Sequence, residues 1–295
     1  MQRRTLLAAL TAAPAATLLG ACSVEQTVSD GPAAPSLQPL SFEPRLALVL
    51  AAGGPRGFAH VGVLKALHEI GFEPDLIIGA SVGALIGSAA AAGLSVERIE
   101  ALAFEFDFYR MARWSPGDGM KLDGTEIATL LRRTLVVTDF AQLKTAFAVV
   151  ATDLASGLPA AFNRGDVAVA VQASCAIPGY FAPVRIRGRE FVDADVASPL
   201  PVKVARTLGA RRVLAVDVAV HADKPRPSGA EIYEQGDRAK RAQIDAEARL
   251  ADLVLHPYFG YWVKLSRDYR ESTARAAYEQ TLAQAPAIER LMLGA

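Results

Sequence analysis

The chain has 295 residues, of which 52% are apolar and 21% are charged, a composition typical of a globular protein with a sizeable core. Its 31 lysine and arginine residues balance its 31 aspartate and glutamate residues. Proteins that bind nucleic acid usually carry a basic surplus, so this balance excludes an electrostatic footprint of that kind and we expect no nucleic-acid partner.

The first residues have the pattern of a bacterial export signal. Two arginines at positions 3 and 4 precede an apolar stretch that is too short and too interrupted by proline to span a bilayer. The stretch ends in LGAC, which resembles a lipoprotein signal and predicts removal of residues 1–21 and acylation of Cys22. Such a protein would be exported and membrane-anchored, in the periplasm or at the outer membrane of a Gram-negative cell. The alternative is a plain signal peptide with an incidental cysteine.

The segment after the signal is rich in proline, serine and glycine and has no periodicity, so residues 22–44 are predicted to form a flexible tether. The chain has only two cysteines. If Cys22 is acylated, Cys175 has no disulfide partner, and we expect it to be a small buried core residue. Neither paired histidines nor a Cys-x-x-Cys motif indicates a metal, and no cofactor is expected.

From residue 45 onward, short apolar runs alternate with helical patterns. The predicted strands are RLALVLAAGG, DLIIGA, FAVVATDL, REFVDAD and RRVLAVDVAV. The predicted helices are FAHVGVLKALHEIG, residues 82–92, VAVAVQAS and PVKVARTLG, followed by a helical part at about 230–295 that includes AEARLADLVLHPYF and YRESTARAAYEQTLAQ. This alternation predicts one α/β domain over residues 45–295, with a mostly parallel sheet covered by helices on both faces.

A serine with glycine neighbours follows the second predicted strand. In GASVG, Ser81 lies between Gly79 and Gly83, as a nucleophile on a tight strand-to-helix turn requires, because small residues let strand and helix pack closely. The helix that begins at Val82 would direct its first amides toward developing negative charge. An ordinary small-residue turn before an alanine-rich helix is the alternative.

The first predicted strand ends in a glycine loop. The amides of Gly53 and Gly54, together with that of Val82, would form an oxyanion hole if Ser81 is a nucleophile. A dinucleotide-binding loop is the alternative. However, Ala52 occupies the first position of the Gly-x-Gly-x-x-Gly pattern, and no acidic residue follows the next strand to bind a ribose.

These blocks resemble the patatin-like phospholipase family over residues 45–206. AGGPRG followed by FAHVGVLKAL resembles its oxyanion loop and helix, GASVG its nucleophile elbow, ASCAIPGYFAPV an internal segment, and FVDADVASPLPV the region of its catalytic aspartate. The resemblance implies a three-layer α/β/α fold and a dyad of Ser81 and Asp193 without histidine. It also places Arg56 in the oxyanion region and implies cleavage of acyl esters of lipids at a membrane surface.

The chain departs from that family pattern in two places. Ala52 stands where the family usually has glycine, and this restricts the backbone if the amide of residue 52 is to face the site. The family also usually follows the aspartate with Gly-Gly or Gly-Ala, whereas this chain has Ala194 and Asp195. Asp195 adds a second carboxylate close to Asp193, which would raise the pKa of Asp193 if both are desolvated.

Two other functions remain open at this point. The first is a catalytically weak lipoprotein that binds lipid or a partner protein through the same cleft. The second is an α/β-hydrolase-type esterase with a triad of Ser81, Asp217 and His221, whose chain order fits that fold. Asp217 and His221 share one predicted strand and its exit, which is a poor arrangement for two triad partners, so the dyad is favoured. The aromatic segment at residues 104–120 fits either an apolar flap or core packing.

Overall fold

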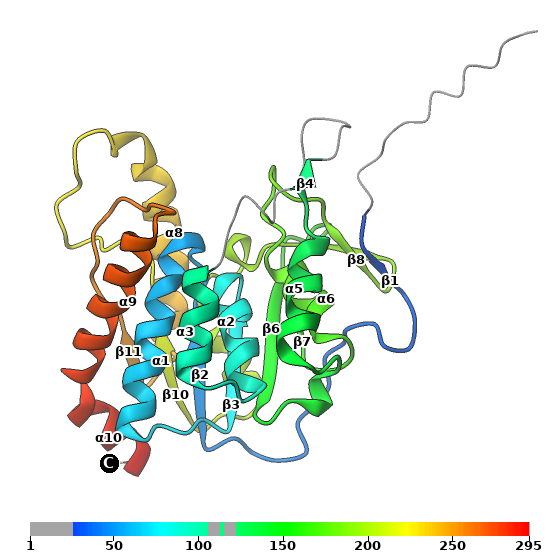
Figure 1. Cartoon of the computed structure of the whole chain (residues 1–295), viewed down its shortest axis with the longest axis horizontal. Helices are drawn as coiled ribbons and strands as arrows, with labels where there is room; N and C mark the ends of the chain where they lie inside the picture. The colour runs from blue at the N-terminus through cyan, green and yellow to red at the C-terminus, as the bar shows by residue number, and fades with distance from the viewer. Residues whose placement is uncertain (1–25, 106–112, 115–121, 295) are drawn as a thin grey trace, which may run out of the picture.

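A nine-stranded sheet forms the centre of the protein (Figure 1). The computed structural model describes residues 26–105, 113–114 and 122–294. In spatial order the strands are β1 (Val28–Ser29), β8 (Val184–Ile186), β9 (Arg189–Val192), β6 (Ala146–Asp153), β3 (Leu76–Ala80), β2 (Leu46–Leu50), β10 (Arg212–Val216) and β11 (Leu253–Leu255). β7 (Pro159–Phe162) pairs with β6 beside this path, and β4 (Arg113–Trp114) pairs with β5 (Leu122–Asp123) in a separate ribbon.

Most of the neighbouring strands in the centre of the sheet are parallel, as the alternation of strands and helices in the sequence predicts. β6, β3, β2, β10 and β11 run in one direction, whereas β7 and β9 are antiparallel to β6. β9 overlaps only the last two residues of β6, since Val192 pairs with Thr152 and Phe191 pairs with Asp153. The end of β9 therefore reaches the same sheet edge as the carboxyl ends of the parallel strands, although it runs against β6.

Helices cover both faces of this sheet and give the expected three-layer α/β/α fold. They are α1 (Phe58–Ile70), α2 (Val82–Ala91), α3 (Val96–Glu105), α5 (Thr125–Leu135), α6 (Val167–Ser174), α7 (Val202–Thr207), α8 (Glu234–Ala248), α9 (Arg267–Leu282) and α10 (Ala285–Leu293). In Figure 1, α1, α2, α3 and α9 lie on the near face, and α7 contacts β2, β3 and β10. Among the described residues, no helix is both long and apolar enough to cross a membrane.

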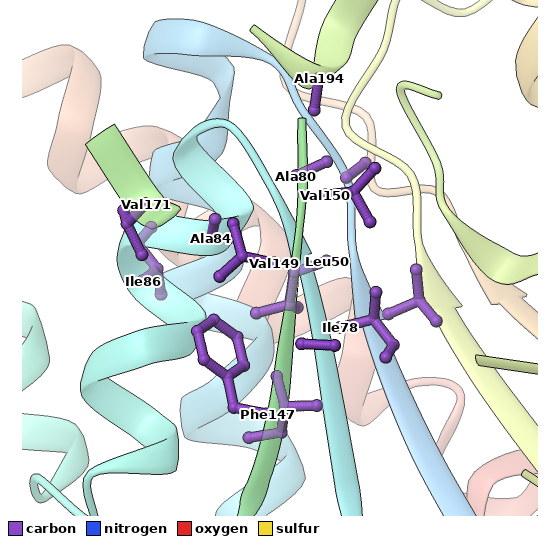
Figure 2. Close-up of a cluster of buried hydrophobic side chains, with 14 of the residues drawn as sticks. Leu50, Ile78, Ala80, Ala84, Ile86, Phe147, Val149, Val150, Val171 and Ala194 are labelled. Carbon is purple, nitrogen blue, oxygen red and sulfur yellow. The ribbon is translucent and has the colours of Figure 1, made fainter. Parts of the chain in front are cut away.

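The central strands are apolar along their whole length because both of their faces are covered. Every residue of β2 and β3 is buried. Figure 2 shows Leu50, Ile78 and Val149 of three neighbouring strands packed together, with Ala84 and Ile86 of α2 beside them. α1 ends as its sequence predicts, because Gly71 adopts a left-handed conformation with φ of 79°. This packed core provides a rigid support for the loops at the strand ends.

The C-terminal part contains a strand that the sequence analysis assigned wrongly to a helix. α8 ends at Ala248, and Leu253–Leu255 form β11 rather than continuing a helical segment through residue 259. The three apolar residues extend the sheet by pairing with Leu214, Ala215 and Val216 of β10. Edge pairing supplies backbone hydrogen bonds that a three-residue helix does not have.

Most of the predicted tether packs against the domain. β1 pairs with β8, Ser36 bridges to Arg164, and the Ala34 side chain is buried. The prediction of a flexible segment is therefore wrong for residues 26–44, where short backbone pairings compensate for the lack of hydrophobic periodicity. The predicted signal peptide and Cys22 lie outside the described residues, as do residues 106–112 and 115–120 of the aromatic segment.

Candidate active site

Ser81 occupies a strained turn between β3 and α2. Its φ of 51° and ψ of −122° are unusual for a residue with a side chain, and such strain is common at functional sites. A Cβ atom on Gly79 would lie 2.4 Å from the Cα atom of Ala84, so glycine is required for α2 to turn back so closely onto β3. The sequence-predicted elbow is therefore present, and Ser81 is buried within it at 6% exposure.

The Ser81 hydroxyl donates a hydrogen bond to Asp193, with 2.7 Å between Oγ and Oδ2. The two residues are 112 positions apart in the chain and meet because β3 and β9 end at the same sheet edge. Asp193 is held firmly. Its amide donates to the Ala176 carbonyl at 2.9 Å, and its carbonyl accepts a hydrogen bond from the Thr152 hydroxyl at 2.8 Å. Neighbouring secondary structure thus aims the carboxylate at the serine.

Burial makes Asp193 a stronger base than an ordinary aspartate. The side chain is 2% exposed, and its desolvation raises its pKa from 3.8 to about 7. Hydrogen bonds from the Asp195 amide and the Ser81 hydroxyl oppose this rise because they favour the carboxylate. The net result is a carboxyl group whose pKa suits proton transfer near neutral pH.

The glycine loop supplies amides beside the serine elbow. Gly54 has φ of 52°, in the left-handed region that favours glycine, and it opens the 3-10 helix Gly54–Gly57. Among the described residues, no hydrogen-bond acceptor contacts the amides of Gly53 and Gly54, and Val82 is the first residue of α2, where an amide has no partner within the helix. These three amides are available as oxyanion donors.

Ala52 fits the loop without strain, although the family resemblance led us to expect glycine there. Its amide donates to the carbonyl of Pro199 at 2.8 Å and is therefore not available to the site. Alanine adopts fewer backbone conformations than glycine, but this does not destabilise the loop, because the φ angle of Ala52 is not positive. The oxyanion donors are left to Gly53, Gly54 and Val82.

Arg56 braces the glycine loop through its side chain. The guanidinium donates to the carbonyls of Gly260 and Tyr261 and lies over the ring of Phe259 at 5.5 Å. These contacts fix the segment around residue 260 against the loop. The structure therefore connects Arg56 to the oxyanion region as a support for the loop, with its hydrogen bonds directed to backbone carbonyls.

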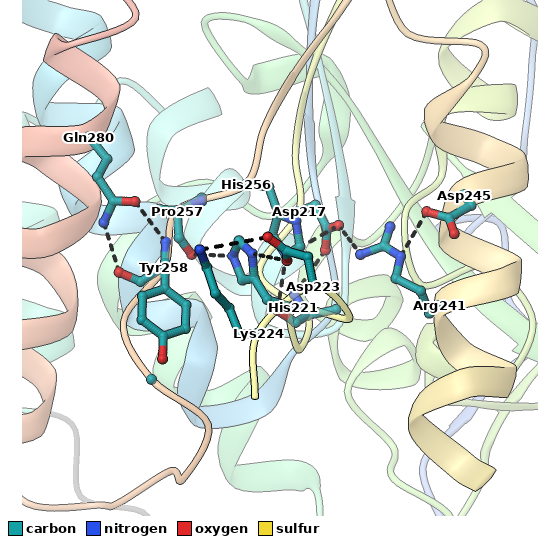
Figure 3. Close-up of polar contacts among 12 residues, drawn as sticks. Asp217, His221, Asp223, Lys224, Arg241, Asp245, His256, Pro257, Tyr258 and Gln280 are labelled. Atoms are coloured by element: carbon teal, nitrogen blue, oxygen red, sulfur yellow. Dashed lines mark hydrogen bonds and ion pairs between the residues drawn. The ribbon is translucent and has the colours of Figure 1, made fainter. Parts of the chain in front are cut away.

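The alternative triad of Ser81, Asp217 and His221 is not assembled. Figure 3 shows that Asp217 binds Arg241, with 2.6 Å between Oδ2 and Nη1, and the Ser81 hydroxyl is already bound to Asp193. His221 is stacked on His256 with 3.6 Å between ring centroids, and its two ring nitrogens face the Pro257 carbonyl and Asp223. This cluster is a separate polar network beside β10.

Three residues around the dyad were not identified by the sequence analysis as part of the site. Ser174 accepts a hydrogen bond from the Ser81 amide at 2.8 Å, and the Cys175 thiol lies against the Ser81 hydroxyl. Cys175 is buried as predicted, and burial raises the pKa of its thiol. Both residues belong to the ASCAIPGYFAPV block, which was the available signal. Lys240, which binds Asp195, gives no such signal because its helix has the charge pattern of an exposed surface.

A cavity of about 230 Å³ lies on the side of the glycine loop next to α8. Gly53 and Arg56 line it from the loop, Lys240 and Arg241 from α8, and Val263 from the segment after β11. Within the described residues there is no cluster of histidine, cysteine or carboxylate side chains suited to a metal ion. Of the proposed oxyanion donors, Gly53 lines this cavity, whereas Ser81 and Asp193 are not among its lining residues.

Comparison with known proteins agrees with this fold. The crystal structure of VipD from Legionella pneumophila superimposes with a TM-score of 0.60 and 13% sequence identity, covering 89% of this chain and 71% of VipD. An uncharacterized NTE family protein of Mycobacterium bovis is 34% identical over 184 residues, which are 60% of this chain and 50% of that protein. The chain thus matches about half the length of this relative.

A human protein shows the same relationship over a smaller share of its length. The patatin-like phospholipase domain-containing protein 6 of Homo sapiens is 31% identical over 181 residues, which are 59% of this chain and 13% of that protein. Residues 48–206, more than half of the chain, match the sequence profile described as Patatin-like phospholipase. The matched region includes the glycine loop, Ser81 and Asp193, and the protein belongs to the patatin-like phospholipase family.

Proposed function

We propose that the chain is a serine lipid acyl hydrolase that cleaves acyl esters with a dyad of Ser81 and Asp193. The observation that carries this proposal is the 2.7 Å hydrogen bond from the Ser81 hydroxyl to a buried carboxylate, at a strained elbow. A base that contacts the nucleophile directly needs no histidine between them. Membership of the patatin-like phospholipase family supports an ester of a lipid as the substrate.

The proposed reaction has two steps that use the same residues. Ser81 Oγ attacks the ester carbonyl carbon while its proton passes to Asp193, and the amides of Gly53, Gly54 and Val82 stabilise the oxyanion. Collapse of the intermediate breaks the bond to the alcohol, which takes the proton from Asp193. Water then attacks the acyl-enzyme, gives a proton to Asp193, and releases the fatty acid as Ser81 regains that proton.

Ser81→Ala tests this function. The variant removes only the nucleophile, so hydrolysis of p-nitrophenyl esters and phospholipid vesicles should fall to the background rate, while the thermal unfolding temperature stays within a few degrees of wild type. Cys175→Ser is a suitable comparison, because it changes a neighbouring buried side chain without removing the nucleophile. Hydrolysis by Ser81→Ala at the wild-type rate would contradict the proposal, and complete absence of hydrolysis by the wild-type protein would favour a binding role.

We further propose that Cys22 is acylated and anchors the protein to a membrane, where a lipid substrate is available. The LGAC sequence after an apolar stretch supports this proposal. Mass spectrometry of the protein from bacterial membranes should find Cys22 as the first residue with an added lipid mass. Cys22→Ala should release the protein from the membrane fraction. A mature protein cut at another residue and lacking lipid would contradict the anchor.

A further inference from the structure

Asp195 places a second carboxylate beside the proposed base. Asp193 caps the N-terminus of the short 3-10 helix Ala194–Val196, and the amide of Asp195 within that helix donates to Asp193 Oδ1 at 2.8 Å. The negative charge of Asp195 raises the pKa of Asp193, because a second negative charge disfavours ionisation of the first. Without compensation, this charge would keep Asp193 protonated, and thus inactive as a base, up to a higher pH.

Lys240 of α8 supplies that compensation. Its ammonium group donates to Asp195 Oδ2, and the side chains of Lys240 and Asp195 are 38% and 32% exposed. The other carboxylate oxygen of Asp195, Oδ1, is buried and has no hydrogen-bond partner among the described residues. Lys240 is therefore the only hydrogen-bonding contact of that carboxylate within the part of the chain that the structure describes.

The groups that face Asp193 come from four parts of the fold. They are the Ser81 hydroxyl at the elbow, the Cys175 thiol after α6, Asp195 in the 3-10 helix, and Lys240 on α8. Of these, Lys240 is the one cation, and its charge lowers the pKa of Asp193. Asp237 and Arg241 of α8 lie on the same cavity, but Asp237 binds Arg226 and Arg241 binds Asp217 and Asp245.

We propose that Lys240 is a positioning residue that neutralises Asp195 and fixes its loop, so that Asp193 acts as a base at neutral pH. α8 spans residues 234–248 and lies outside residues 48–206, which match the family profile. Asp195 replaces the glycine or alanine expected from the family resemblance, and Lys240 offsets the extra charge from outside the matching region. This inference rests on the proposed function, because it concerns the base of that reaction.

The test is the pH dependence of kcat/KM on a soluble p-nitrophenyl ester between pH 5 and pH 9. The acidic limb of this pH–rate profile is the pH range in which activity rises as the base loses its proton. Lys240→Met should move this limb to higher pH by about half a unit to one unit, as expected for loss of one nearby opposite charge. The rate below the limb should fall about threefold to tenfold, with little change at pH 9. Asp195→Asn should move the limb to lower pH, and the double variant should lie close to wild type.

Two variants control for effects other than charge. Lys240→Arg keeps the cation and should keep the wild-type limb. Arg238→Met removes a cation from the same helix, but that side chain is 75% exposed and binds Glu234, so the limb should not move. Thermal unfolding of each variant verifies that it is folded.

Three outcomes are decisive. If the acidic limb of the pH–rate profile did not move in Lys240→Met, or if activity fell equally at every pH, Lys240 would have a structural role only. Either result would overturn this inference and leave the proposed hydrolase function intact. Absence of Ser81-dependent turnover in wild type would instead overturn the proposed function. In that case a ¹³C NMR titration of the Asp193 carboxyl, assigned with Asp193→Asn, measures the same shift without turnover, and identical titration in wild type and Lys240→Met would overturn the inference.

Discussion

Asp193→Asn is expected to lower ester turnover by about a hundredfold to ten-thousandfold, the usual contribution of a positioned base. Asparagine keeps the shape of the side chain, but its amide does not accept the proton of Ser81. The 2.7 Å contact between Ser81 and Asp193 leaves no room for another group between them. The loss should appear in kcat measured with p-nitrophenyl esters, and Asp195→Asn should retain most of the wild-type activity.

The same substitution should not weaken the fold. Burial raises the pKa of Asp193 from 3.8 to about 7, so the folded state binds this proton more tightly than the unfolded state does. Ionisation of Asp193 therefore opposes folding, and the stability contributed by this group falls as pH rises from about 4 to about 7. Asparagine has no charge at any of these pH values, so the variant does not lose this stability as the pH rises. At pH 8 the unfolding temperature of Asp193→Asn should equal or exceed that of wild type.

Two results would move the role of base to another residue. If Asp195→Asn were inactive while Asp193→Asn turned over normally, the wrong carboxylate would have been assigned. If His221→Ala or His256→Ala lost activity more than about tenfold while remaining folded, a histidine would be required. The stacked pair of His221 and His256 in Figure 3 lies in a different network from Ser81, so we expect neither result.

Gly83→Ala is expected to be the most damaging change of a single methyl group near the site. A Cβ atom at this position would lie 2.2 Å from the carbonyl oxygen of Leu50 and 2.6 Å from that of Ala51. Both contacts are with backbone atoms, at the last residue of β2 and the residue after it, so no side chain can rotate away. α2 would have to move off the sheet, and the free energy of unfolding should fall by about 3 kcal/mol or more, with loss of ester turnover.

Gly236→Ala is the matched control for that substitution. Gly236 lies in α8 and its φ is not positive. Among the described residues, apart from its chain neighbours and the nearby backbone of its own helix, no atom lies within 4 Å of the position of an added Cβ atom. Alanine should stabilise the helix there by up to about 1 kcal/mol. Urea unfolding of both variants measures the difference. Equal stability of Gly83→Ala and wild type would contradict the close packing of the elbow on β2.

The fold and the dyad could be predicted from the sequence to different extents. Apolar runs ending in glycine identify the buried strands β2 and β3, and glycines on both sides of Ser81 indicate a tight turn. Asp193 is harder to find, because it is separated from Ser81 by 112 positions and follows an antiparallel strand. Only the family resemblance connected the two residues in advance, since no local pattern specifies which strand ends meet.

The features that the sequence did not reveal depend on long-range contacts. Residues 26–44 have a linker-like composition, yet the pairing of β1 with β8 holds them on the domain. β11 is only three residues long, and its strand conformation comes from pairing with β10. Lys240 resembles any exposed helix lysine until α8 is placed against Asp195.

The most direct test of the account is the site of covalent reaction with a fluorophosphonate probe. The probe forms a bond only with an activated serine hydroxyl, so it reports nucleophile and base together. We predict a single labelled peptide containing Ser81 in the wild-type protein and no labelling in Ser81→Ala. Asp193→Asn should label at least about a hundredfold more slowly. Labelling at another serine, or at Ser81 with equal rates in wild type and Asp193→Asn, would contradict the dyad.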